Sequence, residues 1–216
     1  MKRTITYITA VLFVAFAAMA VAAQDHRKFE VFGGYAYANY DNVLDSIDNG
    51  IDSNISLRGF NASATYNFHK YVGAKFDYSL TANRREFNDP TLDLEVKYKN
   101  NQFLGGIQIK DNRDDASRFK PFVHVLAGLA NQKFNAKGTV ISNPPTVTLL
   151  DAHPSTNNFA MVFGGGLDIK VHKNVDIRVV QFDYNPVFFG DQRIGTYDLQ
   201  SKTQNNIRMS FGVVFH

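Results

Sequence analysis

The sequence lacks cysteine and tryptophan, and its charges are closely balanced. Without cysteine, zinc–thiolate centres, iron–sulfur clusters, disulfides and thiol nucleophiles are all excluded. The 23 lysine and arginine residues stand against 20 aspartate and glutamate residues, so no basic excess points to nucleic acid as a partner. What remains is a chain of 216 residues, 13% of them aromatic, which is long enough for one ordinary domain.

Long apolar runs are confined to the start of the chain. Positive charges at residues 2–3 precede an apolar segment at 10–20, and small residues lead up to Ala23. This three-part layout is typical of a cleavable signal peptide, so we expect residues 1–23 to be removed on export and residues 24–216 to form the mature domain. A membrane-spanning helix is the alternative, but the apolar run is shorter than the roughly 20 residues that a spanning helix needs.

Beyond the leader, the dominant pattern is an alternation of apolar and polar residues. At 72–81, for example, one face carries Val72, Ala74, Phe76, Tyr78 and Leu80. Successive side chains of a strand point to opposite faces, so the pattern predicts sheets with one apolar and one polar side. Eight such runs are predicted, at about 28–40, 59–68, 72–81, 97–110, 119–132, 158–171, 175–187 and 204–215, and the seventh loses its parity around Val180 to Asp183, which indicates a bulge.

The two faces differ in a way that favours a membrane barrel. The apolar faces contain no charge, whereas the opposite faces combine glycine, asparagine, serine and threonine with charged residues. The charged residues assigned to the lumen are Glu30, Lys75, Asp77, Asp168, Arg178 and Arg208. A transmembrane barrel turns its apolar face to lipid and fills its lumen with the polar set, so we predict an eight-stranded antiparallel transmembrane β-barrel with a lumen charge network. A soluble barrel with a water-facing polar side is the alternative.

Connection lengths support the same architecture. The links at 69–70, 111–117 and 172–174 are short, and those at 41–54, 84–96, 135–157 and 188–203 are predicted to be long loops. Outer-membrane barrels place their short turns in the periplasm and their long loops outside the cell.

The later strands resemble the OmpA-type family of small outer-membrane β-barrels. Four blocks carry the resemblance: PFVHVLAG at 121–128, FAMVFGGGLDIK at 159–170, IRVVQFDY at 177–184 and QNNIRMSFGVVF at 204–215. It implies the outer membrane of a Gram-negative-type bacterium, contact with outer-membrane lipid, and recognition of the C-terminal strand by the barrel assembly machinery. Members of the family usually end on an aromatic residue, whereas here Phe215 is followed by His216.

Catalytic, cofactor-binding and metal-ligating patterns are missing from the sequence, and none is predicted. The six histidines include no pair at helical metal spacing. An acyl hydrolase needs a serine beside a histidine that a carboxylate orients. Asp151, His153 and Ser155 lie close together in the sequence, but Pro154 separates the histidine from the serine. The acidic loop at 41–54 departs from a calcium-binding loop, because Ile47 occupies a ligand position.

We therefore expect a non-enzymatic integral outer-membrane protein that contributes to envelope structure and displays surface loops for interaction. One alternative is a narrow pore, with small gaps left by the lumen glycines at 34, 106, 128, 164, 166 and 212. A lipid-modifying enzyme and a soluble lipocalin-like periplasmic barrel are the others.

Overall fold

The structure, a computed structural model, describes residues 26–40, 55–89, 92–113, 117–142, 146–152, 155–190, 192–194, 197–199 and 202–216. The predicted leader at 1–23 and the acidic loop at 41–54 lie outside these ranges. Within them, no helix has the length and apolar character needed to cross a membrane.

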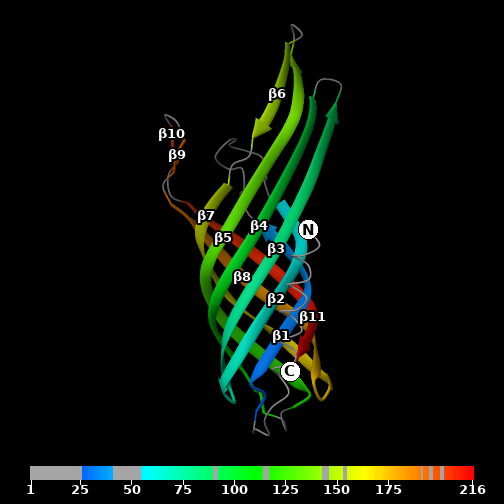
Figure 1. Cartoon of the computed structure of the whole chain (residues 1–216), viewed down its shortest axis with the longest axis vertical. Coiled ribbons are helices and arrows are strands. Elements are labelled where there is room, and N and C mark those ends of the chain that lie inside the picture. Colours follow the sequence, from blue (N-terminus) through cyan, green and yellow to red (C-terminus); the bar gives the residue numbers. More distant parts are fainter. Residues whose placement is uncertain are drawn as a thin grey trace, which may run out of the picture.

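Eight long strands form a closed antiparallel barrel, as predicted (Figure 1). They are β1 (Phe29–Tyr40), β2 (Ile55–His69), β3 (Val72–Asp89), β4 (Leu92–Lys110), β5 (Phe119–Ser142), β7 (Ser155–His172), β8 (Val175–Phe189) and β11 (Lys202–Phe215). Neighbours follow the order β4-β3-β2-β1-β11-β8-β7-β5, and pairing between β5 and β4 closes the ring. A separate small hairpin joins β9 (Gln192–Ile194) to β10 (Tyr197–Leu199).

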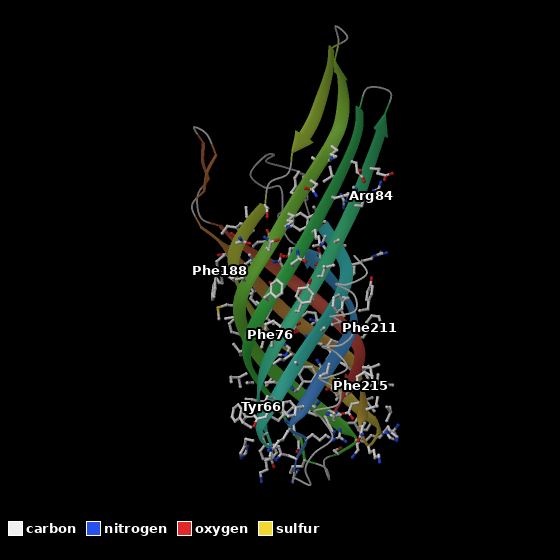
Figure 2. All side chains as sticks on the ribbon, viewed as in Figure 1. Tyr66, Phe76, Arg84, Phe188, Phe211 and Phe215 are labelled. Carbon is white, nitrogen blue, oxygen red and sulfur yellow. The ribbon has the colours of Figure 1, made fainter. Side chains whose placement is uncertain are left out.

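Alternation along each strand separates the two sides of the wall. Phe76 is 53% exposed on the outside, whereas its neighbours Lys75 and Asp77 are 2% and 0% exposed in the lumen. Figure 2 places Phe76, Phe211 and Phe188 on the wall between Tyr66 towards one end and Arg84 towards the other. Because every strand of a closed barrel has two neighbours, the wall has no open edge at this level.

The predicted bulge lies in β8. Leu167 of β7 pairs with Val180, but the next residue, Asp168, pairs with Arg178, so Val179 is left over. The register to β11 shifts at the same place, between Ser210 and Gly212. The extra residue reverses the parity of β8, because its lumen positions are even before the bulge and odd after it.

The predictions of long loops at 84–96 and 135–157 are wrong. β3 and β4 remain paired as far as Asp89 and Leu92, and β5 continues past the end of β7 to pair with β6 (Thr146–Ala152). Residues 82–89, 92–99 and 133–142 together with β6 therefore form a four-stranded sheet, here named the extension, that rises beyond the barrel on one side (Figure 1). The alternation signal is lost there because both faces of a sheet outside lipid tolerate polar side chains.

Candidate functional site

The six charged residues predicted to face the lumen are all buried inside the barrel. Their exposed fractions lie between 0% and 3%, for Glu30, Lys75, Asp77, Asp168, Arg178 and Arg208. An isolated charge at such a position would carry a large desolvation cost, so the arrangement of their partners decides what the lumen can do.

One cluster of charges is centred on Arg208 of β11. Its guanidinium lies 2.9 Å from a carboxylate oxygen of Asp77 on β3 and 2.7 Å from one of Asp183 on β8. The second oxygen of Asp183 lies 2.9 Å from Nε2 of His124 on β5. Nδ1 of this histidine is 3.3 Å from the ammonium of Lys75. The cluster therefore connects four strands across the lumen.

A second cluster is centred on Asp168 of β7. Arg178 of β8 donates two hydrogen bonds to its carboxylate, at 2.8 and 3.0 Å. Lys110 of β4 donates to Asp168 at 2.8 Å and to Glu30 of β1 at 2.9 Å. Since β4 is not adjacent to β1 or to β7 in the ring, the ammonium of Lys110 holds distant parts of the wall together.

Gln181 joins the two clusters. It accepts a hydrogen bond from Arg178 at 2.7 Å and donates one to Asp183 at 2.8 Å. The guanidinium of Arg178 also lies over the rings of Phe32 and Phe122, 4.4 and 4.1 Å from their centroids. Such cation–π contacts stabilise a desolvated cation in addition to its ion pair.

A third group of charges lies at the turn end of the barrel and was missed by the sequence reasoning. Asp176 of β8 lies 3.1 Å from Lys120, 2.9 Å from Nε2 of His216 and 3.4 Å from Arg27. Parity along the strands marks Asp176 and Lys110 as lumen residues. Asp183 is harder to assign from the sequence. Because of the bulge at Val179, it faces the lumen as Arg178 does, although one position is odd and the other even.

Apolar and amide side chains continue the filling of the lumen towards the extension. One buried cluster consists of Leu104, Leu126, Ala130, Ala160, Val162 and Val187. Gln102 and Asn185 exchange hydrogen bonds at 3.2 and 2.7 Å, and Gln132 donates to Gln204 at 3.1 Å.

Three of the six lumen glycines lie in close contact with neighbouring atoms. A Cβ atom at Gly166 would lie 2.8 Å from the ring of Phe122, and one at Gly34 would lie 2.7 Å from that of Phe32. At Gly164 it would lie 2.1 Å from a carboxylate oxygen of Asp183. The space beside these glycines is occupied by neighbouring side chains and strands.

The residues considered for catalysis and metal binding are not brought together in the part of the chain that the structure describes. There, no group of three histidine, aspartate or glutamate side chains could hold a metal ion. Ser155 begins β7 and lies within 3.4 Å of the amide of Asn131. His153 falls outside the described residues, so the structure gives no distance between it and Ser155.

The outer surface of the wall decides the environment of the barrel. Large hydrophobic side chains of every barrel strand are exposed, among them Phe60, Phe103, Val125, Phe163, Phe182 and Phe211. A soluble barrel would bury such a continuous apolar belt, whereas hydrocarbon solvates it. The sequence matches the outer membrane protein beta-barrel domain over residues 8–215. The chain belongs to this family. It is an outer-membrane protein of a Gram-negative-type bacterium.

The chain is similar to several solved structures at low sequence identity. Ail, the attachment invasion locus protein of Yersinia pestis, is 17% identical with a TM-score of 0.48, over 89% of this chain and 100% of that one. Neisserial surface protein A is 16% identical with a TM-score of 0.45, over 87% and 96%. OprG of Pseudomonas aeruginosa is 10% identical with a TM-score of 0.47, over 87% and 94%. No curated protein sequence matches the chain.

Proposed function

We propose that this outer-membrane barrel is a non-enzymatic anchor that holds the extension upright outside the cell. There the loops that connect its strands interact with surface partners. The observation that carries the proposal is the asymmetry of the wall. The extension rises at the end opposite to the short turns (Figure 1). The lumen of the barrel beneath it is occupied by buried polar and apolar side chains. Short turns face the periplasm in outer-membrane barrels, so this end faces outward.

The lumen charge network gives the barrel the stiffness that an anchor needs. Lys110 links β4 to β1 and β7, and Arg208 links β11 to β3 and β8. The contacts of Lys110 and the contact of Arg208 with Asp77 join strands that are not neighbours, so they cross the lumen and oppose flattening of the ring. Removing one partner would leave a buried charge uncompensated, so the network resists opening.

The inner face of the extension is packed onto the mouth of the barrel. Tyr40, Leu57 and Tyr98 form a buried apolar cluster, against which Phe134 of the extension packs. Asn100 donates a hydrogen bond to the hydroxyl of Tyr40. These contacts tie β4 and β5 to β1 and β2 at the point where the extension leaves the ring, so it is held by the barrel.

Two further partners belong to this proposal. The apolar belt contacts outer-membrane lipid, and the C-terminal strand β11 is the segment that the barrel assembly machinery would recognise. Phe215 is exposed at the end of β11, while His216 folds back to Asp176. The aromatic residue therefore remains available on the lipid side, even though it is not the final residue.

Trimming the extension tests the display function. Arg84 pairs with Lys97 and Ala136 pairs with Ala152, so residues 85–96 and 137–151 can each be replaced by a two-residue turn without disturbing the barrel registers. We expect the trimmed protein to keep the heat-dependent shift in gel mobility of a folded barrel. Cells that carry it should lose adhesion to each other or to extracellular material. Unchanged adhesion by these cells would contradict the display function.

The pore and enzyme alternatives are tested separately. A lumen filled by paired charges and apolar side chains predicts no reproducible conductance steps when the purified protein is added to planar bilayers. Regular steps would overturn the closed lumen and favour a pore. Altered lipid A in an overexpressing strain would overturn the non-enzymatic assignment.

A further inference from the structure

The outward face of strands β2, β3, β4, β5 and β7 changes character in steps towards the extension. Paired residues on neighbouring antiparallel strands point to the same side, so the strand registers define rows of side chains around the wall. The first row is apolar and consists of Ala62, Tyr78, Phe103, Leu129 and Phe159. The second row, one step further out, consists of Phe60, Leu80, Asn101, Asn131 and Asn157.

The third row is cationic. It consists of Arg58, Ala82, Lys99, Lys133 and Ser155, and its three charged side chains are exposed. Four residues separate Tyr78 from Ala82 along β3, a distance of roughly 14 Å. Over that distance the wall passes from hydrocarbon-facing rings through amides to cations, which is the order of tail, interface and phosphate in a lipid leaflet.

The three cations of this row have no carboxylate partner within the described ranges, which distinguishes them from the charges further out. Lys99 and Lys133 are paired directly across β4 and β5. Like charges in this arrangement repel and destabilise the sheet, so a bound anion would relieve them.

The next charges on the same face of β3 and β4 are already paired. Arg84 lies 2.6 Å from Glu86, and Glu95 lies 2.5 Å from Arg84 and 2.8 Å from Lys97. On this face of β3 and β4, the positive charges at the base of the extension therefore lack carboxylate partners, whereas those further out have them. Figure 2 places Arg84 further along the wall than the ring of Phe188.

We propose that Arg58, Lys99 and Lys133 bind the phosphate groups of outer-leaflet lipids whose acyl chains lie against the apolar row. Guanidinium and ammonium groups are the usual protein ligands of phosphate. The small side chain of Ala82 leaves room for a headgroup between Arg58 and Lys99. The inference rests on the proposed function, because it requires the extension to lie outside the cell.

A lipid fits this surface better than a soluble polyanion does. The cation row is continuous with the lipid-facing wall, and only the amide row separates it from the exposed ring of Phe103. A dissolved anion gains nothing from that continuity, whereas a lipid gains both the contact of its chains and the attraction of its phosphates.

Lipid binding by the purified full-length barrel tests the inference. Native mass spectrometry in detergent would compare the wild-type protein with a cation-row variant that combines Arg58→Gln, Lys99→Gln and Lys133→Gln. The probes are diphosphorylated lipid A and the same lipid without its phosphates. A matched control combines Lys70→Gln, Arg118→Gln and Lys173→Gln, which removes three exposed cations from the opposite end.

We expect the wild-type and control proteins to bind diphosphorylated lipid A equally, and the cation-row variant to bind it at least about tenfold more weakly. The dephosphorylated lipid should bind all three proteins weakly. Equal affinity of the cation-row and control variants would overturn the inference, as would binding that does not depend on the phosphates. Displacement of the lipid by an equal concentration of inorganic phosphate would show a site for free anions and would also overturn it.

Cysteine labelling in intact cells separates this inference from the proposed function. The chain has no cysteine, so Glu86→Cys in the extension and Lys173→Cys in a turn each introduce a unique thiol. A membrane-impermeant maleimide should label only Glu86→Cys. If it does so while lipid binding is unaffected by the cation row, the lipid inference fails and the display function stands. Labelling of Lys173→Cys alone would refute the orientation on which both depend.

Discussion

The lumen and the extension use the same kinds of charged residue in opposite ways. In the lumen, Arg208 is 2% exposed and pairs with Asp77 across the barrel and with Asp183 on the neighbouring strand. In the extension, Arg84 has a side chain that is 59% exposed and pairs with Glu86 on its own strand and Glu95 on the next. The comparison teaches that the surrounding medium decides the energetic weight of an ion pair. Buried pairs are costly to break, and exposed pairs contribute little.

The largest effect is expected from removing the central lumen cation. Arg208→Met leaves Asp77 and Asp183 buried without their main partner, which should lower the free energy of unfolding by about 3–5 kcal/mol. Urea titration in lipid vesicles, followed by the shift in gel mobility, measures this change. The matched control is a triple variant that adds Asp77→Asn and Asp183→Asn. It should recover part of the loss, and an Arg208→Met protein as stable as the wild type would refute the structural role of the network.

A charge placed on the lipid-facing wall should have the next largest effect. Phe76 lies on the outside of β3 between the two ends of the barrel (Figure 2). Phe76→Arg should destabilise the protein by about 2–4 kcal/mol, because arginine is costly near the bilayer midplane. Ala82→Glu, on the same face of the same strand at the base of the extension, is the control and should be tolerated, because Ala82 lies between Arg58 and Lys99. Equal losses of stability in the two variants would place the membrane boundary elsewhere.

A methyl group added inside the wall should cost less than either charge change. In Gly164→Ala the new Cβ would lie 2.1 Å from Asp183 and 2.7 Å from the carbonyl oxygen of Phe182. Such overpacking should destabilise the barrel by about 1–3 kcal/mol in the same urea titration. Gly105→Ala on the lipid side meets no atom within 4 Å and should be neutral. A neutral Gly164→Ala would mean that the lumen has free space.

The smallest effect concerns the exposed ion pairs of the extension. The ammonium of Lys97, and then the guanidinium of Arg84, hold the pKa of the Glu95 carboxyl below its ordinary value of 4.5. The carboxylate therefore stabilises the extension above pH 4.5, and this stabilisation is lost as the pH falls through the lowered pKa. Lys97→Met should raise the pKa measured by carbon NMR without changing the global unfolding midpoint. An unchanged titration would show that the ion pair is absent in solution.

The barrel could be predicted from the sequence because lipid imposes a strict alternation on it. Phe76 and Phe163 must face outward and Asp77 and Asp168 inward, so period two persists wherever a strand crosses the membrane. The bulge was also visible, since the parity of the seventh run breaks near Val180.

The extension could not be predicted in the same way. The consecutive residues Asn83, Arg84, Arg85 and Glu86 belong to β3, yet no apolar face marks them as a strand. Within the loop expected at 135–157, residues 136–142 of β5 instead pair with β6.

Parity also does not reveal which lumen charges meet. It places Lys110 inside, but the contact of Lys110 with both Glu30 and Asp168 depends on how far the strands are staggered around the ring. The sequence pattern therefore shows which side of the wall a residue faces, but not how deep in the lumen it lies.

The pairing of β1 with β11 has a consequence for how the protein is made. These two strands come from opposite ends of the domain, and their register runs from Val31 opposite Phe215 to Tyr40 opposite Asn206. Until β11 has docked, both β1 and β8 present unpaired amides, which hydrocarbon cannot satisfy. The ring is therefore closed only when these two distant strands meet, and a chain that lacks either of them would have no stable form in the bilayer.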